Sequence, residues 1–173
     1  MGRFECDFKV TFNPQLDVEQ YPLPRFEELL LKLKNGKRFS KIDLADAYLQ
    51  LELDEEAKKV AVINTPHGLY QYQRLPFGIA SAPAIFQGLI EQVIKGIPGC
   101  ASYFDDVIVT GRSDEEHLHN LEALFQRLMD HGLQCNLQKC SFFQDRVEYL
   151  GNLLSEHGVQ PSESDVEAIK KLK

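Results

Sequence analysis

Two neighbouring aspartates, Asp105 and Asp106, stand between two short apolar segments, 101–104 and 107–110, that favour β-strands. Adjacent side chains of a strand point to opposite faces, but at the tip of a tight hairpin both carboxylates can reach one cavity. Unpaired carboxylates at the edge of an apolar core are costly, and a divalent cation compensates them. The alternative is a plain hairpin turn, because Asp is a common turn residue.

A third carboxylate, Asp43, ends the strand-like segment 39–43. Three carboxylates from two neighbouring strand ends suffice for two Mg²⁺ ions, which prefer few protein carboxylates, several waters and substrate phosphates. Two such ions roughly 3.5–4 Å apart can stabilise both oxygens of an in-line phosphoryl transfer. We expect no nearby basic residue to neutralise the aspartates, so the three carboxylates should converge on one pocket. The alternative for Asp43 is a helix N-cap.

The elements that must position these residues follow from the apolar periodicity and the turn residues. The pattern predicts helices over 24–34, 81–94, 113–131 and 164–173, strands at 39–43, 101–104 and 107–110, a hairpin of 60–65 with 69–75, and a last strand or hairpin at 147–154. Ser113 and Glu116 form a capping box, and Gly132 closes the same helix. This order, rich in hairpins, favours an antiparallel α+β sheet over a parallel one.

Two of these helices should each bury an apolar stripe. The predicted inward residues are Ile85, Phe86, Leu89, Ile90, Val93 and Ile94 in one helix and Leu118, Leu121, Leu124, Phe125 and Leu128 in the other.

The composition excludes several classes of protein. A chain of 173 residues predicts one domain, and 43% hydrophobic with 26% charged residues argues against disorder. No apolar run approaches the roughly 20 residues of a membrane helix, and the N-terminus is unlike a signal peptide, so we expect a soluble intracellular protein. The net charge of -7 argues against a protein that coats nucleic acid, but not against a nucleotide-processing enzyme. The four cysteines predict reduced thiols, and a zinc site from Cys135, Cys140 and His131 is rejected for its spacing.

Several segments resemble the motifs of reverse transcriptases, in the order of that family. Residues 39–48 (FSKIDLADAY) resemble the first catalytic motif, and residues 103–106 (YFDD) resemble the Tyr-x-Asp-Asp motif. Residues 75–87 (LPFGIASAPAIFQ) resemble the link into the palm helix. Residues 132–140 (GLQCNLQKC) and 148–151 (EYLG) are similar to the fourth and fifth motifs. The amino-acid sequences of these motifs most resemble those of gypsy-type LTR retrotransposon polyproteins and their retroviral relatives.

The resemblance implies a polymerase palm, with an antiparallel sheet backed by two helices, over residues 39–51 and 81–155. Partial fingers would occupy residues 1–38 and 52–80, and the thumb would start at 156–173. The implied activity is RNA-directed DNA synthesis from deoxynucleoside triphosphates. The alternatives are a non-catalytic transposon remnant, or a reused palm that acts as a binding module; an RNA-binding sheet of the RRM type is a weaker third.

By the same resemblance, two Mg²⁺ ions, or Mn²⁺, would be held by Asp43, Asp105 and Asp106 and by the backbone carbonyl of Leu44. Lys139 would protonate the departing pyrophosphate. Its alternative is an ordinary solvent-exposed lysine.

The resemblance also implies a nucleotide site. Arg3 would clamp the triphosphate, and the backbone N–H groups of Asp46 and Ala47 would bind it. Tyr48 would block a ribose 2′-hydroxyl, or else be an ordinary half-buried tyrosine. Phe77 stands where retroviral relatives carry Gln, so a hydrogen bond to the nucleotide is lost.

The resemblance further implies a truncated fragment, without the fingertip strands and most of the thumb, that shows little primer extension by itself. Its partners would be a deoxynucleoside triphosphate, a primer–template, and the remaining polyprotein domains (thumb, RNase H, integrase), with no membrane partner. We expect it in the cytoplasm, in a virus-like particle, or in the nucleus. One basic stretch would contact phosphates or be a solvated helix end: Lys32, Lys34, Lys37, Arg38 and Lys41.

Overall fold

The structure is a computed structural model, and it describes residue 13 and residues 21–162. The chain divides into two compact units. The larger unit is built from Pro24–Leu44 and Val93–Lys173, and the smaller from Met1–Leu23 and Ala45–Gln92.

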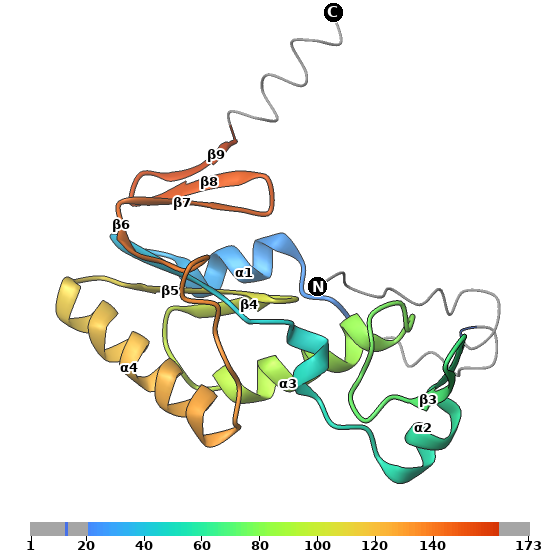
Figure 1. Cartoon of the computed structure of the whole chain (residues 1–173). Coiled ribbons are helices and arrows are strands. Elements are labelled where there is room, and N and C mark those ends of the chain that lie inside the picture. The colour runs from blue at the N-terminus through green and yellow to red at the C-terminus, as the bar shows by residue number, and fades with distance from the viewer. Residues whose placement is uncertain (1–12, 14–20, 163–173) are drawn as a thin grey trace, which may run out of the picture. The chain divides into compact units, whose positions relative to one another are not determined.

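The larger unit contains a four-stranded sheet in the order β4-β5-β1-β6, whose neighbouring strands are antiparallel (Figure 1). The strands are β1 (Arg38–Asp43), β4 (Cys100–Tyr103), β5 (Asp106–Gly111) and β6 (Ser141–Gln144). The predicted antiparallel α+β architecture is therefore confirmed. The sequence analysis did not predict β6, which is short and pairs with β1 through an irregular register.

The two faces of β1 are covered by different helices because its side chains alternate. Phe39 belongs to the apolar cluster that contains Leu29 and Leu33 of helix α1 (Phe26–Leu33). Ser40 points the other way and shares a 2.7 Å hydrogen bond with His117 of helix α4 (Asp114–Asp130). The sheet thus lies between α1 and α4.

Helix α4 begins and ends as the sequence predicts. The backbone N–H of Glu116 donates to the Ser113 hydroxyl at 3.2 Å, and the Glu116 carboxylate accepts from the Arg112 N–H at 2.7 Å. At the other end, Gly132 has φ 67°, which glycine adopts without strain, and the N–H of Leu133 donates to the carbonyl of Leu128.

In each of the two predicted apolar stripes, one residue expected to be buried is exposed. Leu118 is 48% exposed, whereas the buried face of α4 includes the polar residues His117 and Asn120. Asn120 is tolerated there because its amide donates to the carbonyl of Thr110. Ile85, in helix α3 (Ala82–Ile94), is 49% exposed.

A second sheet in the larger unit has three antiparallel strands, β7 (Arg146–Tyr149), β8 (Asn152–Ser155) and β9 (Gly158–Pro161) (Figure 1). The sequence predicts only the first two. Val147, Tyr149 and Leu154 pack in the same apolar cluster as Phe39, which holds this sheet to the four-stranded sheet. The helix predicted at 164–173 lies outside the described residues.

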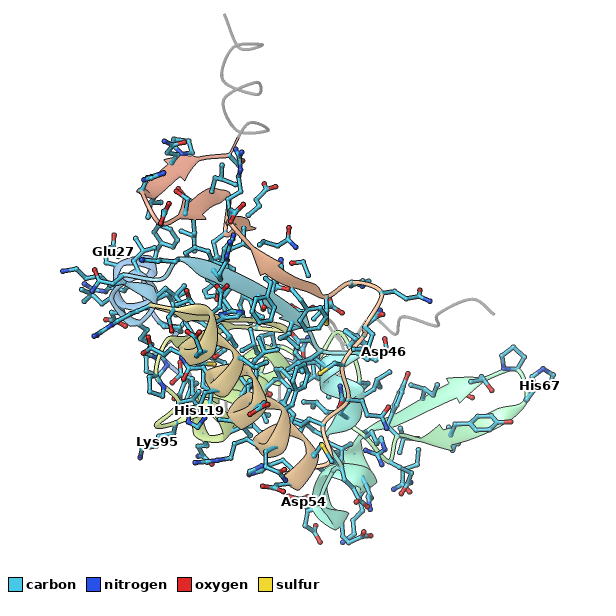
Figure 2. The ribbon with its side chains drawn as sticks, turned by 90° about the vertical axis from the view of Figure 1, so that its left-hand side faces the viewer. Glu27, Asp46, Asp54, His67, Lys95 and His119 are labelled. Carbon is cyan, nitrogen blue, oxygen red and sulfur yellow. The ribbon has the colours of Figure 1, made fainter. Side chains whose placement is uncertain are left out.

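The smaller unit contains the 3₁₀-helix η2 (Ala47–Gln50), helix α2 (Glu55–Val60), the hairpin β2 (Val62–Thr65) with β3 (Gly68–Gln71), and most of α3. His67 lies at the tip of the hairpin (Figure 2). The sequence analysis missed α2, which is too short to show an apolar stripe. Its start is fixed by Asp54, whose carboxylate accepts from the N–H of Ala57 at 2.7 Å.

Within the described residues, every helix is too short or too polar to cross a lipid bilayer.

Candidate active site

The turn between β4 and β5 sets the position of the paired aspartates. Tyr103 and Asp106 are register partners, so the connecting loop consists of Phe104 and Asp105 alone. Phe104 has φ 54°, and only this first loop residue has a positive φ, as in a II′ hairpin turn. Glycine usually occupies that place, so a bulky aromatic residue stores backbone strain there. The predicted tight hairpin is confirmed, with Asp105 at its tip.

Asp43 and Asp106 are direct partners in the register of β1 and β5. Directly opposed residues of an antiparallel pair project to the same face of the sheet. The N–H of Leu44 donates to the carbonyl of Asp105 at 3.0 Å, which fixes the tip of the hairpin against the end of β1. Asp43 is therefore not a helix N-cap; that position belongs to Asp46, before η2.

The three carboxylates act on one another electrostatically. The side chain of Asp43 is 16% exposed, and burial raises its pKa. The positive charge of Lys139 lowers this pKa, and the negative charges of Asp105 and Asp106 raise it further. Burial and the two neighbouring aspartates together outweigh the lysine charges, so the net effect is a raised pKa of Asp43.

Two lysines reach these carboxylates, so the expectation that no basic residue would neutralise them is wrong. The Nζ atom of Lys41 lies 2.7 Å from Oδ2 of Asp106, and that of Lys139 lies 3.8 Å from Oδ2 of Asp43. Lys41 stands two residues before Asp43, and the period of a strand puts both on one face.

The loop before β6 brings Lys139 to Asp43. The N–H of Asn136 donates to the carbonyl of Asp43 at 2.9 Å, and the N–H of Asp43 donates to Sγ of Cys140 at 3.4 Å. The N–H of Lys139 donates to the carbonyl of Asn136, which closes the turn. The sequence analysis gave Asn136 and Cys140 no role, because their partners are backbone groups far away in the chain.

The donor set suits Mg²⁺ or Mn²⁺, since Asp43, Asp105 and Asp106 supply hard carboxylate oxygens at two neighbouring strand ends. Among the described residues, however, no three acidic, histidine or cysteine side chains stand in an arrangement that would already hold a metal ion. In the free protein Asp106 is paired with Lys41, and Asp43 with Lys139. Leu44, whose carbonyl is a predicted ligand, follows Asp43 directly and is 2% exposed.

The cysteines of the described part are free thiols. Burial raises the pKa of Cys135 to about 11, and Cys140 and Asp43 contribute to the rise. The thiol of Cys135 is therefore neutral at physiological pH.

Three predicted nucleotide-site residues follow one another in the smaller unit. Asp46 is exposed, with φ 45° and ψ 48°, and Ala47 is buried. The half-buried ring of Tyr48 lies 5.1 Å from that of Phe77 and 5.8 Å from that of Phe86. The structure thus brings Tyr48 and Phe77 together. Arg3 lies outside the described residues.

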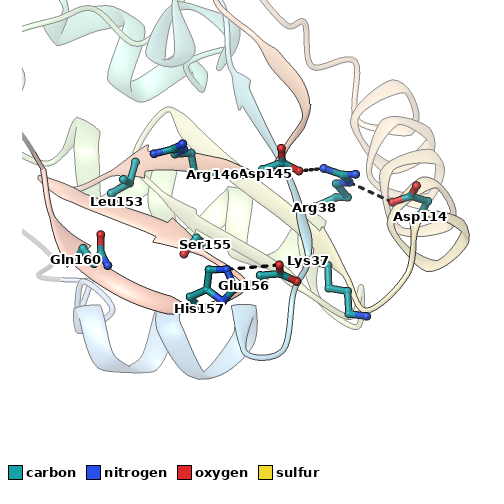
Figure 3. A pocket seen from close by; sticks show the side chains of 10 residues that line it. All are labelled: Lys37, Arg38, Asp114, Asp145, Arg146, Leu153, Ser155, Glu156, His157 and Gln160. Carbon is teal, nitrogen blue, oxygen red and sulfur yellow. Dashed lines mark ion pairs between the residues drawn. The ribbon is translucent and has the colours of Figure 1, made fainter.

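The predicted basic stretch is partly neutralised. Arg38 pairs with Asp114 at 3.4 Å and with Asp145, at one side of a cavity of about 600 Å³ (Figure 3). Lys41 pairs with Asp106. Both cations are already engaged within the protein, so their part of the stretch is less suited to nucleic-acid phosphates than the sequence suggests.

Comparisons with known proteins agree with the motif order. A protein-family model described as "Reverse transcriptase (RNA-dependent DNA polymerase)" matches residues 6–154. The chain is 45% identical to an uncharacterized Caenorhabditis elegans protein, over 97% of the chain and 13% of that protein. It is 35% identical to the Pol polyprotein from the Drosophila melanogaster transposon 297, over 87% of the chain and 14% of the polyprotein.

A solved structure has the same fold. The foamy viral protease-reverse transcriptase in complex with an RNA/DNA hybrid aligns with a TM-score of 0.85 and 23% identity. The alignment covers 96% of this chain and 23% of that one. The chain therefore spans only a small part of the length of the curated relatives and solved structures that it matches.

Proposed function

The chain belongs to the reverse transcriptase family, related to gypsy-type retrotransposon Pol polyproteins, and on that premise we propose that it is the catalytic palm of an RNA-directed DNA polymerase. The reaction is the transfer of deoxynucleotides from their triphosphates to a primer 3′-hydroxyl. The substrates are a deoxynucleoside triphosphate and a primer–template, and the chain acts as one part of a longer polyprotein.

The observation that carries the proposal is the register pairing of Asp43 with Asp106, next to the hairpin tip that bears Asp105. Three carboxylates at two strand ends, with the side chain of Asp43 only 16% exposed, provide hard oxygen ligands for divalent cations. Asp43, Asp105 and Asp106, with the carbonyl of Leu44, would hold two Mg²⁺ or Mn²⁺ ions. When bound, these cations would activate the primer 3′-oxygen and neutralise the charge that develops on the leaving pyrophosphate.

Lys139 acts as the proton donor to the pyrophosphate. Its contact with Asp43 and its exposed side chain support this role, since an ammonium group open to solvent can be reprotonated after each turnover. In the smaller unit, Tyr48 excludes a ribose 2′-hydroxyl by steric clash, supported from behind by Phe77 and Phe86. The backbone N–H groups of Asp46 and Ala47, together with Arg3, bind the triphosphate.

The test is primer extension on an RNA template. We would assay the chain alone and a chimera in which it replaces the matching segment of the transposon 297 polyprotein. We expect little extension by the chain alone, because misplacement of reacting groups by about 1 Å can cost on the order of a hundredfold in rate. The chimera should extend the primer, and the Asp105→Asn, Asp106→Asn double variant should not.

A folded chimera that extends no primer would contradict the proposal and favour the alternative, a non-catalytic palm that binds partners. Folding is checked by the thermal transition of the chimera and of its double variant, which should be similar.

A further inference from the structure

Lys41 lies on the same face of the four-stranded sheet as Asp43 and Asp106, two of the predicted metal ligands. It lies two residues before Asp43 on β1, and its register partner is Ile108, two residues after Asp106 on β5. The Lys41 side chain reaches diagonally across the two strands, and its Nζ atom contacts Oδ2 of Asp106 at 2.7 Å. A diagonal pair of this kind is within reach of a long side chain.

The Lys41–Asp106 pair is shielded from water more than a surface pair. The two side chains are 29% and 27% exposed, whereas those of the pair between Lys59 and Glu56 are 64% and 83% exposed. Solvent and salt screen a shielded pair less, so its attraction is stronger. The charge of Lys41 also lowers the pKa of Asp43, so one ammonium group acts on two carboxylates of the site.

Lys139 differs from Lys41 both in the exposure of its side chain and in its distance from the nearest carboxylate. Its side chain is 67% exposed, and its Nζ atom stands 3.8 Å from Asp43. Lys139 therefore faces solvent, while Lys41 is the internal counter-ion.

We propose that Lys41 is a built-in competitor for the metal site: its ammonium group neutralises Asp106 in the free protein, and a divalent cation must displace it to bind. This inference rests on the proposed function, because it takes Asp43, Asp105 and Asp106 as the metal ligands. A cation that binds Asp106 loses affinity twice, by breaking the ion pair and by repulsion from an ammonium group that stays close. The consequence is a site that fills poorly by itself and fills well when substrate phosphates add their own negative charge and ligands.

The experiment measures Mn²⁺ affinity of the 173-residue chain without nucleotide, by the electron paramagnetic resonance signal of free Mn²⁺. Lys41→Met keeps the length of the side chain and removes the charge, and Lys41→Arg keeps the charge. Lys37→Met is the matched control, because Lys37 is exposed, lies just before β1, and causes the same change in net charge. Asp43→Asn identifies binding at the proposed site.

Lys41→Met should bind Mn²⁺ at least about threefold more tightly than the wild type, since removal of one nearby like charge outweighs solvent screening in a half-buried site. Lys41→Arg and Lys37→Met should stay within about twofold of the wild type, in line with a local effect of charge. Circular dichroism and the thermal transition show that each variant is folded. If Lys41→Met does not fold, Lys41→Gln takes its place with the same expectation.

Two results would overturn the inference alone: an unchanged affinity in folded Lys41→Met, or an equal gain in Lys37→Met, while Asp43→Asn still abolishes binding. The first would make Lys41 a purely structural partner of Asp106, and the second would reduce the effect to net charge. If Asp43→Asn leaves Mn²⁺ binding intact, the metal site itself is wrong, and the proposed function fails together with the inference.

Discussion

Asp43 and Asp106 are partners across β1 and β5, so two carboxylates face the same side of one sheet at neighbouring backbone positions. Like charges placed directly opposite each other destabilise a sheet. The protein tolerates the pair because Lys41 and Lys139 contact one carboxylate each. This balance of two acids and two lysines, with Asp105 beside them, determines both the stability of the free palm and its affinity for cations.

Asp43→Asn should stabilise the metal-free protein while it removes metal binding. The pKa of Asp43 is raised in the fold, chiefly by burial, so the ionised carboxylate costs stability at every pH above its ordinary pKa of 3.8. In EDTA at pH 7 the variant should melt roughly 2 °C higher than the wild type.

This gain should shrink as the pH falls toward the ordinary aspartate pKa of 3.8, because protonation of Asp43 then relieves the same cost in the wild type. Differential scanning calorimetry at both pH values measures it. A gain that is equal at the two pH values would show that ionisation of Asp43 is not its source.

His117 should make the larger unit less stable in acid. Its side chain is fully buried, and desolvation lowers its pKa below the ordinary value of 6.5, against a smaller opposite effect of Asp114. The unfolded chain therefore binds a proton that the fold resists, and stability falls as the pH drops through about 6.5. His117→Leu should lose roughly 2–4 °C at pH 7.5 with the hydrogen bond to Ser40, and should respond less to acidification.

The matched control is His119→Leu, which changes an exposed histidine of the same helix. It should keep the acid sensitivity of the wild type. Thermal melts between about pH 7.5 and pH 5.5 give the comparison, and an acid response that survives in His117→Leu would assign it to other groups.

Tyr149→Phe should stabilise the protein. Tyr149 is 1% exposed, and its hydroxyl has no hydrogen-bond partner among the described residues. Burial, followed by the negative charge of Asp106, raises the pKa of this hydroxyl, so it stays neutral. Since a buried unpaired hydroxyl costs about 1–3 kcal/mol, its removal should raise the melting temperature by about 2 °C or more.

A lower melting temperature for Tyr149→Phe would mean that the hydroxyl is bonded after all. Tyr149→Ala is the contrasting variant, because the loss of the buried ring should cost about 3–5 kcal/mol.

The parts of the fold that depend on neighbouring residues could be predicted from the sequence. Ser113, Glu116 and Gly132 gave both ends of α4, and the apolar segments around Asp105 and Asp106 gave the hairpin. The short elements α2 and β6 could not be predicted, because six residues of helix or four residues of strand carry too little periodicity.

At the candidate site, prediction from the sequence is limited by contacts between residues far apart in the chain. Burial of His117 in place of Leu118 depends on a hydrogen bond to Ser40, on a strand far away in the sequence. The register that sets Asp43 against Asp106 is likewise a tertiary fact. The position of Lys41, however, could have been predicted, because the two-residue period of a strand places it on the same face as Asp43. The sequence analysis did not apply that rule to a charged residue.

Tyr48 offers the sharpest test of the proposed substrate. Its ring packs on Phe77 and Phe86 in the smaller unit, which holds it in one position. If that ring excludes the 2′-hydroxyl, Tyr48→Val in the chimera should admit ribonucleoside triphosphates and change deoxynucleotide use much less, because a clash acts only on the extra oxygen. We expect the ratio of kcat/KM for the two sugars to shift by roughly tenfold or more, since a lost clash is worth at least about 1.4 kcal/mol. Tyr72→Val is the control, because Tyr72, like Tyr48, is a partly buried tyrosine that packs against the buried cluster of Leu75, Ile79 and Ala82. Tyr72→Val should lose similar stability without a change in sugar preference. An equal shift in both variants would trace the effect to loosening of the smaller unit and would remove Tyr48 from the nucleotide site.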